Sequence, residues 1–265
     1  MNLSFFLPAV FVFGTSLILS LLVLHFFPKW NLLDNPTKYG HSRAPIPYPG
    51  GIAPLLALLL GILLFFPHSP KFLGLFSGIA IIAALSFWDD RCKVSALFRL
   101  VVHFATAALI AFSGIKIEFL GNPFGDAFAL AEIFPLLPEI ITIFWIVGFA
   151  SVMNWLDGIP GLSSASSAAA GIFIGLLSLT PLVDQPETAS LAFIFFAACA
   201  GFFFFNIPPA RMLLGDTGAM SFGIFLASLT VFSGGKMATV FIVLALPLLD
   251  AANVILTRLL AGQSP

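Results

Sequence analysis

Four short polar segments interrupt an otherwise apolar chain, and their acids could do chemistry. Only 9% of the 265 residues are charged and 60% are hydrophobic, and the mean hydropathy is +1.09. A carboxylate at membrane depth is costly unless it faces a cavity, a cation or a polar partner. Acids where separate apolar runs end or begin therefore indicate one metal-dependent site at a membrane face: Asp89, Asp90, Asp157 and Asp216.

The first polar segment, residues 34–51, reads DNPTKYGHSRAPIPYPGG. Its prolines disfavour a helix, and its closing Gly-Gly pair lets backbone pass closely where the next apolar run begins. Lys38, His41 and Arg43 could hold phosphate oxygens. A basic loop that only fixes membrane topology explains the segment equally well.

The second segment, FWDDRCKVSALFRL over residues 87–100, places two adjacent carboxylates at the end of an apolar run. A helix C-terminus prefers cations, so Asp89 and Asp90 need compensation by a metal ion or by Arg91 and Lys93. A solvated acidic turn paired with those two cations is the alternative interpretation.

The third segment, NWLDGIPGLSSASS over residues 154–167, carries Asn154 and Asp157 three residues apart. On a helix this spacing puts both side chains on one face. The Gly-Ile-Pro-Gly stretch then breaks the helix, which membrane proteins tolerate where the backbone lines protein or a watery cavity. The small residues that follow permit close helix packing, and packing alone is the alternative reason for the segment.

The fourth segment, FNIPPARMLLGDTGAMSFG over residues 205–223, sets Asp216 and Thr217 between two glycines. Helix capping explains this pattern, and divalent cation binding by Asp216 is the functional alternative. Mg²⁺ is typically held by one or two carboxylates together with substrate phosphates. The four segments together supply acids, phosphate-binding cations and glycine turns, which favours phosphoryl transfer.

The elements that must position these segments are membrane helices. A helix needs roughly 20 apolar residues to cross the bilayer core. Nine segments qualify: 4–27, 50–67, 71–88, 97–114, 138–153, 162–181, 189–206, 217–233 and 237–258. Brief connections predict an all-α polytopic bundle without a soluble domain, and the long unbroken apolar runs are against a β-barrel.

The distribution of cations predicts the orientation. The first apolar run has no basic residue before it and no cleavage site after it, so we expect a retained helix with the N-terminus outside. Eight of the 11 Lys and Arg residues then fall on one side, which the positive-inside rule places in the cytoplasm with the C-terminus. All four acids fall on that side too. The net charge of -1 gives no case for nucleic acid.

In this order and spacing, the segments resemble the polyprenyl-phosphate N-acetylhexosamine-1-phosphate transferases, glycosyl transferase family four. The specific parts are the Pro-Gly-Gly loop, the Asp-Asp pair with Arg99 after it, NWLDGIPGL and FNIPPARMLLGDTGAM, and the resemblance covers residues 34–265. It implies a Mg²⁺-dependent enzyme of the bacterial inner membrane. A polyprenyl phosphate, usually undecaprenyl phosphate, would attack a UDP-N-acetylhexosamine at the cytoplasmic face. UMP and a lipid diphosphate sugar would form, as the first membrane step of cell-envelope polysaccharide synthesis.

The resemblance also implies residue roles. The predicted catalytic residues are Asp89, Asp90 and Asp157. Mg²⁺, or Mn²⁺ in its place, is expected at Asp90 and Asp216. The predicted substrate-binding residues are Lys38, His41, Asn154 and Asn206.

Two departures from the family pattern leave alternatives open. Pro160 stands where many members carry a second aspartate. The chain stops at residues 262–265, which match the start of the family's His-rich loop. We therefore expect a single integral-membrane transferase domain over residues 1–265 that lacks this loop and the last helix. A catalytically inactive truncated paralogue that binds the carrier lipid is one alternative, and a cation-coupled membrane transporter is another. The sugar, the carrier length and the oligomeric state, a homodimer included, stay open.

Overall fold

The computed structural model describes residues 6–39, 42–92, 94–120, 128–232, 256–258, 260 and 262, with only the backbone of residues 38 and 39. Helices dominate this part of the chain. The eight longer ones are α1 (Phe6–Phe26), α2 (Ile52–Phe65), α3 (Pro70–Cys92), α4 (Ala96–Phe112), α6 (Leu137–Leu156), α7 (Leu162–Ser178), α8 (Pro186–Asn206) and α9 (Gly215–Phe232).

The helical membrane architecture is confirmed for the described residues. Five of their helices are long and apolar enough to cross a membrane, namely α1, α3, α6, α8 and α9. The shorter apolar helices α2, α4 and α7 have 14 to 17 residues. Eight of the nine predicted segments thus coincide with helices, whereas segment 237–258 lies outside the described residues except for 256–258. The count of nine spans and the orientation of the termini stay predictions.

The connection between α4 and α6 contains two short strands and a helical turn that no sequence pattern predicts. Strands β1 (Phe119–Leu120) and β2 (Phe128–Ala129) pair in antiparallel fashion, and the one-turn helix α5 (Leu130–Ile133) follows them. A separate 3₁₀ turn, η2 (Pro36–Tyr39), lies between α1 and α2. Two-residue strands give too short an alternation for a sequence pattern to indicate.

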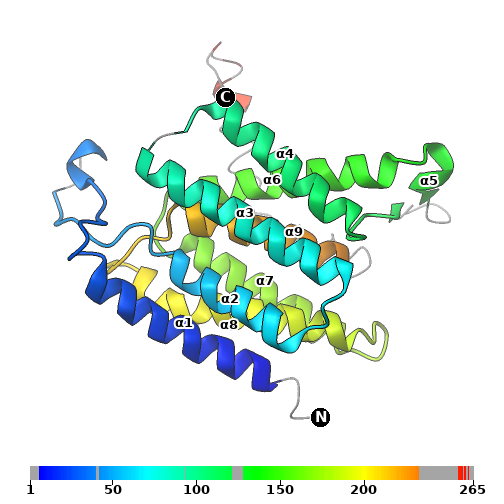
Figure 1. Ribbon diagram of the computed structural model, residues 1–265, viewed down its shortest axis with the longest axis horizontal. Coiled ribbons are helices and arrows are strands. Elements are labelled where there is room, and N and C mark those ends of the chain that lie inside the picture. The colour runs from blue at the N-terminus through cyan, green and yellow to red at the C-terminus, as the bar shows by residue number, and fades with distance from the viewer. Residues whose placement is uncertain are drawn as a thin grey trace.

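Helix α9 lies in the middle of the bundle. Figure 1 shows α1 and α8 along one edge of the bundle and α3, α4 and α6 toward the other, with α6 crossing the direction of α4. Every residue of α9 from 217 to 230 is buried, and α9 contacts α3 and α6 most extensively. A Cβ added at Gly223 would lie 2.6 Å from the carbonyl oxygen of Phe149 in α6. The missing side chain therefore permits this close approach.

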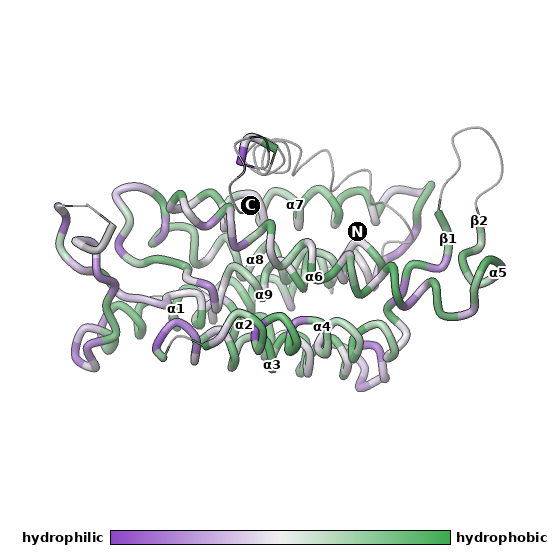
Figure 2. Tube along the Cα trace, turned by 90° about the horizontal axis from the view of Figure 1, so that it is seen from above, coloured by the Kyte–Doolittle hydropathy of each residue, from purple (hydrophilic) through white to green (hydrophobic). Residues whose placement is uncertain are grey.

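The polar segments lie where the chain turns between helices. In Figure 2 the apolar helices fill the middle of the molecule, and most hydrophilic segments lie in connections at its ends. The connections α1–α2, α3–α4, α6–α7 and α8–α9 all contribute residues to one cleft. Alternating helix direction thus brings all four polar segments to the same end of the bundle.

Candidate active site

A cleft of about 930 Å³ opens at the end of the bundle where these four connections meet. Each polar segment contributes to its wall. Among the described residues, the lining is Leu33, Asp34, Asn35, Arg43, Tyr48, Asp89, Asp90, Val94, Arg99, Asn154, Asp157, Gly158, Pro160, Leu213, Gly215 and Asp216. Five predicted site residues therefore share one cavity: Asp89, Asp90, Asn154, Asp157 and Asp216.

Asp89 forms an ion pair at the turn from α3 into α4. Its Oδ2 accepts a hydrogen bond from Arg99 Nη1 at 2.6 Å, and its Oδ1 accepts one from the backbone N–H of Val94 at 2.6 Å. The side chain of Asp89 is only 9% exposed. Arg99 therefore compensates Asp89 in place of the predicted Arg91, which is exposed. Lys93 lies outside the described residues, so its predicted pairing stays a prediction.

Asp90 is held by neutral donors from two other parts of the chain. Tyr48 Oη donates to its Oδ1 at 2.5 Å. Thr217 donates to its Oδ2 twice, from Oγ1 at 2.7 Å and from the backbone N–H at 3.2 Å. Burial, reinforced by the negative charge of Asp90, raises the pKa of the Tyr48 phenol, so Tyr48 stays protonated and donates. No sequence pattern predicts this contact, although Tyr48 stands directly before the Pro-Gly-Gly feature.

Asp157 ends α6 and holds the start of α9. Its Oδ2 accepts a hydrogen bond from the backbone N–H of Gly215 at 3.0 Å. Burial raises the pKa of Asp157 well above its usual range, and the negative charges of Asp216 and Asp90 act in the same direction. The positive end of the α9 dipole favours nearby carboxylates, and Asp157 and Asp90 both accept hydrogen bonds from its first N–H groups.

Asp216 lies in the first turn of α9 and lines the cleft. Its side chain is 31% exposed, and its Oδ2 lies 4.0 Å from Arg99 Nη1. The guanidinium of Arg99 thus stands between Asp89 and Asp216. The two other acids, Asp90 and Asp157, already accept hydrogen bonds from α9, so the capping function that the sequence suggested for Asp216 is carried by acids of other helices.

Glycosyl transferase family 4 has a sequence model that matches residues 72–234. The match covers more than half of the 265-residue chain and includes the second, third and fourth polar segments. The chain belongs to this family. The transferase assignment is therefore confirmed at the level of the family, and the first polar segment lies outside the matched residues.

Curated relatives extend the similarity over most of the chain. A probable undecaprenyl-phosphate N-acetylglucosaminyl 1-phosphate transferase of Bacillus subtilis is 28% identical over 258 residues, which cover 94% of this chain and 70% of the relative. A phospho-N-acetylmuramoyl-pentapeptide-transferase of Listeria welshimeri is 28% identical over 252 residues, with 83% and 71% covered. The Streptococcus uberis protein of the same name is 29% identical over 245 residues, with 82% and 70% covered.

Among the described residues, one predicted substrate-binding residue, Asn206, lies apart from the cleft lining. Asn206 is fully buried. Its Oδ1 accepts hydrogen bonds from Gly161 N and Ser164 Oγ, both at 2.9 Å, and its Nδ2 donates to the Met212 carbonyl at 3.1 Å. Asn206 thus ties the α6–α7 turn to the α8–α9 connection. The side chain of Lys38 and all of His41 lie outside the described residues.

The carboxylate oxygens of the cleft fit a hard divalent cation to which substrate phosphates also bind. The described residues contain no ready cage of three or more His, Cys, Asp or Glu side chains. Mg²⁺ does not require one, because it usually keeps several waters and takes one or two carboxylates plus phosphates. Asp90, Asp157 and Asp216 bring three carboxyl groups to the cleft, and the described ion pairs place a cation near them only at Arg99, whose Nη1 lies 4.0 Å from Asp216 Oδ2.

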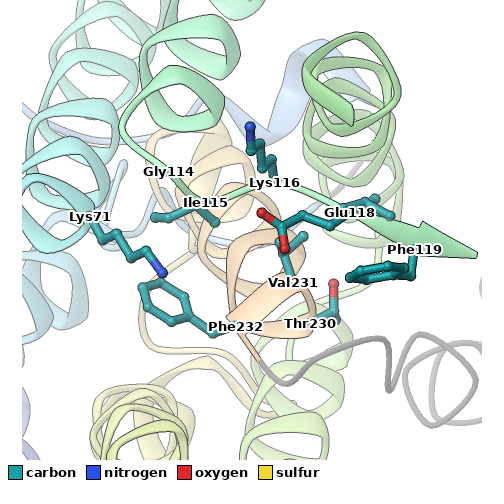
Figure 3. Close-up of a pocket in the computed structure, with 10 residues that line it drawn as sticks. Lys71, Gly114, Ile115, Lys116, Glu118, Phe119, Thr230, Val231 and Phe232 are labelled. Atoms are coloured by element: carbon teal, nitrogen blue, oxygen red, sulfur yellow. The ribbon is translucent and has the colours of Figure 1, made fainter. Parts of the chain in front are cut away.

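A second hollow, of about 230 Å³, lies at the opposite end of the bundle. It is bounded by the start of α3 and the ends of α4 and α9, where Lys71, Gly114 and Phe232 line it (Figure 3). No predicted site residue is among its described lining.

Proposed function

We propose that this family-4 member transfers N-acetylhexosamine-1-phosphate from a UDP-sugar to undecaprenyl phosphate at the cytoplasmic face of a bacterial inner membrane. One oxygen of the lipid phosphate bonds to the sugar-bearing phosphorus, and the bond from that phosphorus to UMP breaks. The products are a lipid diphosphate sugar and UMP. The carrying observation is that acids and Arg99 from the ends of separate helices line one cleft. The names of the relatives support the general reaction.

Two acids of the cleft are proposed to hold Mg²⁺. Asp216 is partly exposed in the cleft, and Asp90 lies in the same cleft with its carboxylate fixed by Thr217 and Tyr48. When bound, the ion neutralises the charge that develops on the phosphates during transfer. Mn²⁺ has the same preference for carboxylate and water oxygens and is the alternative ion.

Arg99 is proposed to bind a substrate phosphate. Its guanidinium offers five N–H donors in a planar fork that matches phosphate oxygens. Asp89 accepts a hydrogen bond from Arg99 Nη1 at 2.6 Å and so orients the guanidinium. Asp89 is therefore proposed to act through Arg99. Asp157 acts through the α9 N-terminus in the same sense. Asn154 lines the cleft and is proposed to contact the substrate directly, as the sequence predicts.

The positions of the acids favour the transferase over the transporter alternative. Transporters commonly bind ions near the bilayer midplane, in broken helices of repeated halves. Here Asp89, Asp90, Asp157 and Asp216 line one cleft at the ends of helices. A ring of acids at one end of the bundle fits a site that meets a water-soluble nucleotide sugar and a membrane lipid together.

The test is a transfer assay on the purified chain in detergent. UDP-N-acetylglucosamine, undecaprenyl phosphate and Mg²⁺ are supplied, and UMP release is measured. We expect UMP release that depends on the lipid and is abolished by Asp216→Asn. Asp184→Asn is the matched control, because Asp184 is exposed in the α7–α8 connection and asparagine tolerates its φ of 46°. Lipid binding without UMP release from the wild-type protein would favour the inactive paralogue.

A further inference from the structure

Tyr48 lines the cleft and contacts one of the two acids that are proposed to hold Mg²⁺. It comes from the α1–α2 connection, outside residues 72–234 that match the family. Its phenol oxygen lies 2.5 Å from Asp90 Oδ1, across 42 positions of sequence. A hydrogen bond this short to an acid of the candidate site is typical of a charge-assisted contact.

The two oxygens of Asp90 are held unequally. Thr217 donates two hydrogen bonds to Oδ2, whereas Tyr48 donates one to Oδ1. A carboxylate has about four lone-pair positions, two on each oxygen. Oδ1 therefore keeps capacity for a further ligand, and Tyr48 is the group that fixes this oxygen.

Backbone pairing holds Tyr48 in place on both sides. Its own N–H donates to the Leu32 carbonyl at 3.1 Å. Two residues later, the N–H of Gly50 donates to the Leu213 carbonyl at 2.7 Å. The ring packs against the start of α9, since a Cβ added at Gly215 would lie 3.0 Å from Tyr48 Cε2. The phenol thus reaches Asp90 from a rigid loop that is itself paired to the segment before α9.

We infer that Tyr48 is a positioning residue, which holds Asp90 Oδ1 in the orientation that binds the divalent cation. The expected effect on kcat rests on the proposed function, whereas the expected effect on divalent cation affinity does not. Precise ligand orientation by hydrogen-bonding neighbours commonly changes metal affinity or activity by about 10- to 100-fold. A residue that served only to fold the loop would change stability and leave these two quantities unaltered in the folded protein.

The experiment compares wild type with Tyr48→Phe, which removes the hydroxyl and keeps the ring on Gly215. Bound Mn²⁺ is measured by electron paramagnetic resonance, and transfer is measured as UMP release. We expect Mn²⁺ affinity and kcat each to fall about tenfold or more, with KM for both substrates within about twofold. Thr180→Val is the matched control, since it removes a hydroxyl that donates only to Leu177 O at the opposite end of the bundle.

The outcomes separate this inference from the proposed function. Equal Mn²⁺ affinity and equal kcat in wild type and Tyr48→Phe would overturn the role of Tyr48. Absence of transfer in the wild type would overturn the proposed function, while the Mn²⁺ titration would still decide on Tyr48. Should Tyr48→Phe fail to insert, tyrosine absorbance of the wild type is recorded with and without Mn²⁺. A difference band that Asp90→Asn abolishes supports the inference, and no band contradicts it.

Discussion

Replacing Asn206 by alanine tests how the cleft is assembled. Asn206 is fully buried and makes three hydrogen bonds, to Gly161, Ser164 and Met212. In Asn206→Ala the three groups that bond to Asn206 would stay buried without this hydrogen bond, and each lost hydrogen bond costs about 1–3 kcal/mol of stability. Because neighbouring losses are not additive, we expect Asn206→Ala to lower the free energy of unfolding by roughly 3 kcal/mol.

The chain contains a convenient reporter for this change. Cys199 is buried in α8 and Cys92 is exposed, so in a Cys92→Ser background a thiol-reactive dye labels Cys199 only on unfolding. Thermal unfolding is followed by dye fluorescence in detergent. Asn206→Ala should label at a clearly lower temperature, and lipid and UDP-sugar KM should stay unchanged below that temperature.

Asn154→Ala is the matched comparison. Asn154 lines the cleft, so this variant should lose transfer activity with an unfolding temperature close to that of the wild type. An unchanged unfolding temperature together with a raised KM in Asn206→Ala would refute the positioning role. Asn206 would then be the substrate-binding residue that the sequence suggests.

Three further predictions follow from single contacts. Arg99→Met leaves Asp89, whose side chain is 9% exposed, without its ion pair and removes the proposed phosphate contact. The kcat of UMP release should therefore fall at least about 100-fold. Arg91→Met, at an exposed neighbour, should keep a kcat near that of the wild type in the same assay. Gly51→Ala places a Cβ 2.5 Å from Gly218 Cα and should cost about 1–3 kcal/mol by overpacking, whereas Gly14→Ala, with nothing within 4 Å, should unfold at or above the wild-type temperature. Asp157 has a raised pKa, so the folded state keeps its proton where the unfolded state has lost it, and stability falls as pH rises from about 3.9 to the raised value. The unfolding temperature of the wild type should therefore fall relative to that of Asp157→Asn as the pH rises through that window. A difference between the two unfolding temperatures that does not change with pH would contradict the raised pKa of Asp157.

The helices were predictable because the bilayer fixes their length and polarity. Apolar runs such as 71–88 and 189–206 fall within α3 and α8. The meeting of the polar segments was predictable for a related reason, since successive spans alternate in direction and put every second connection at the same end. Asp89, Asp157 and Asp216 accordingly line one cleft.

The pairing of side chains inside the cleft was not predictable in the same way. Among the described residues Arg99, and not Arg91, pairs with Asp89, because the turn into α4 brings the first turn of that helix back over the end of α3. The contact of Tyr48 with Asp90 spans 42 residues and depends on how a non-helical loop is held against α9. Such contacts follow from tertiary packing, for which a single sequence has no periodic signal.

The central claim is that the cleft transfers a sugar with its phosphate. UDP-N-acetylglucosamine labelled with ³²P is supplied with undecaprenyl phosphate, in one sample at the phosphate next to uridine and in the other at the phosphate next to the sugar. The proposed reaction puts the sugar-side label in the lipid and the uridine-side label in UMP. Recovery of both labels in UDP, or no transfer of either label to lipid or UMP, would contradict it.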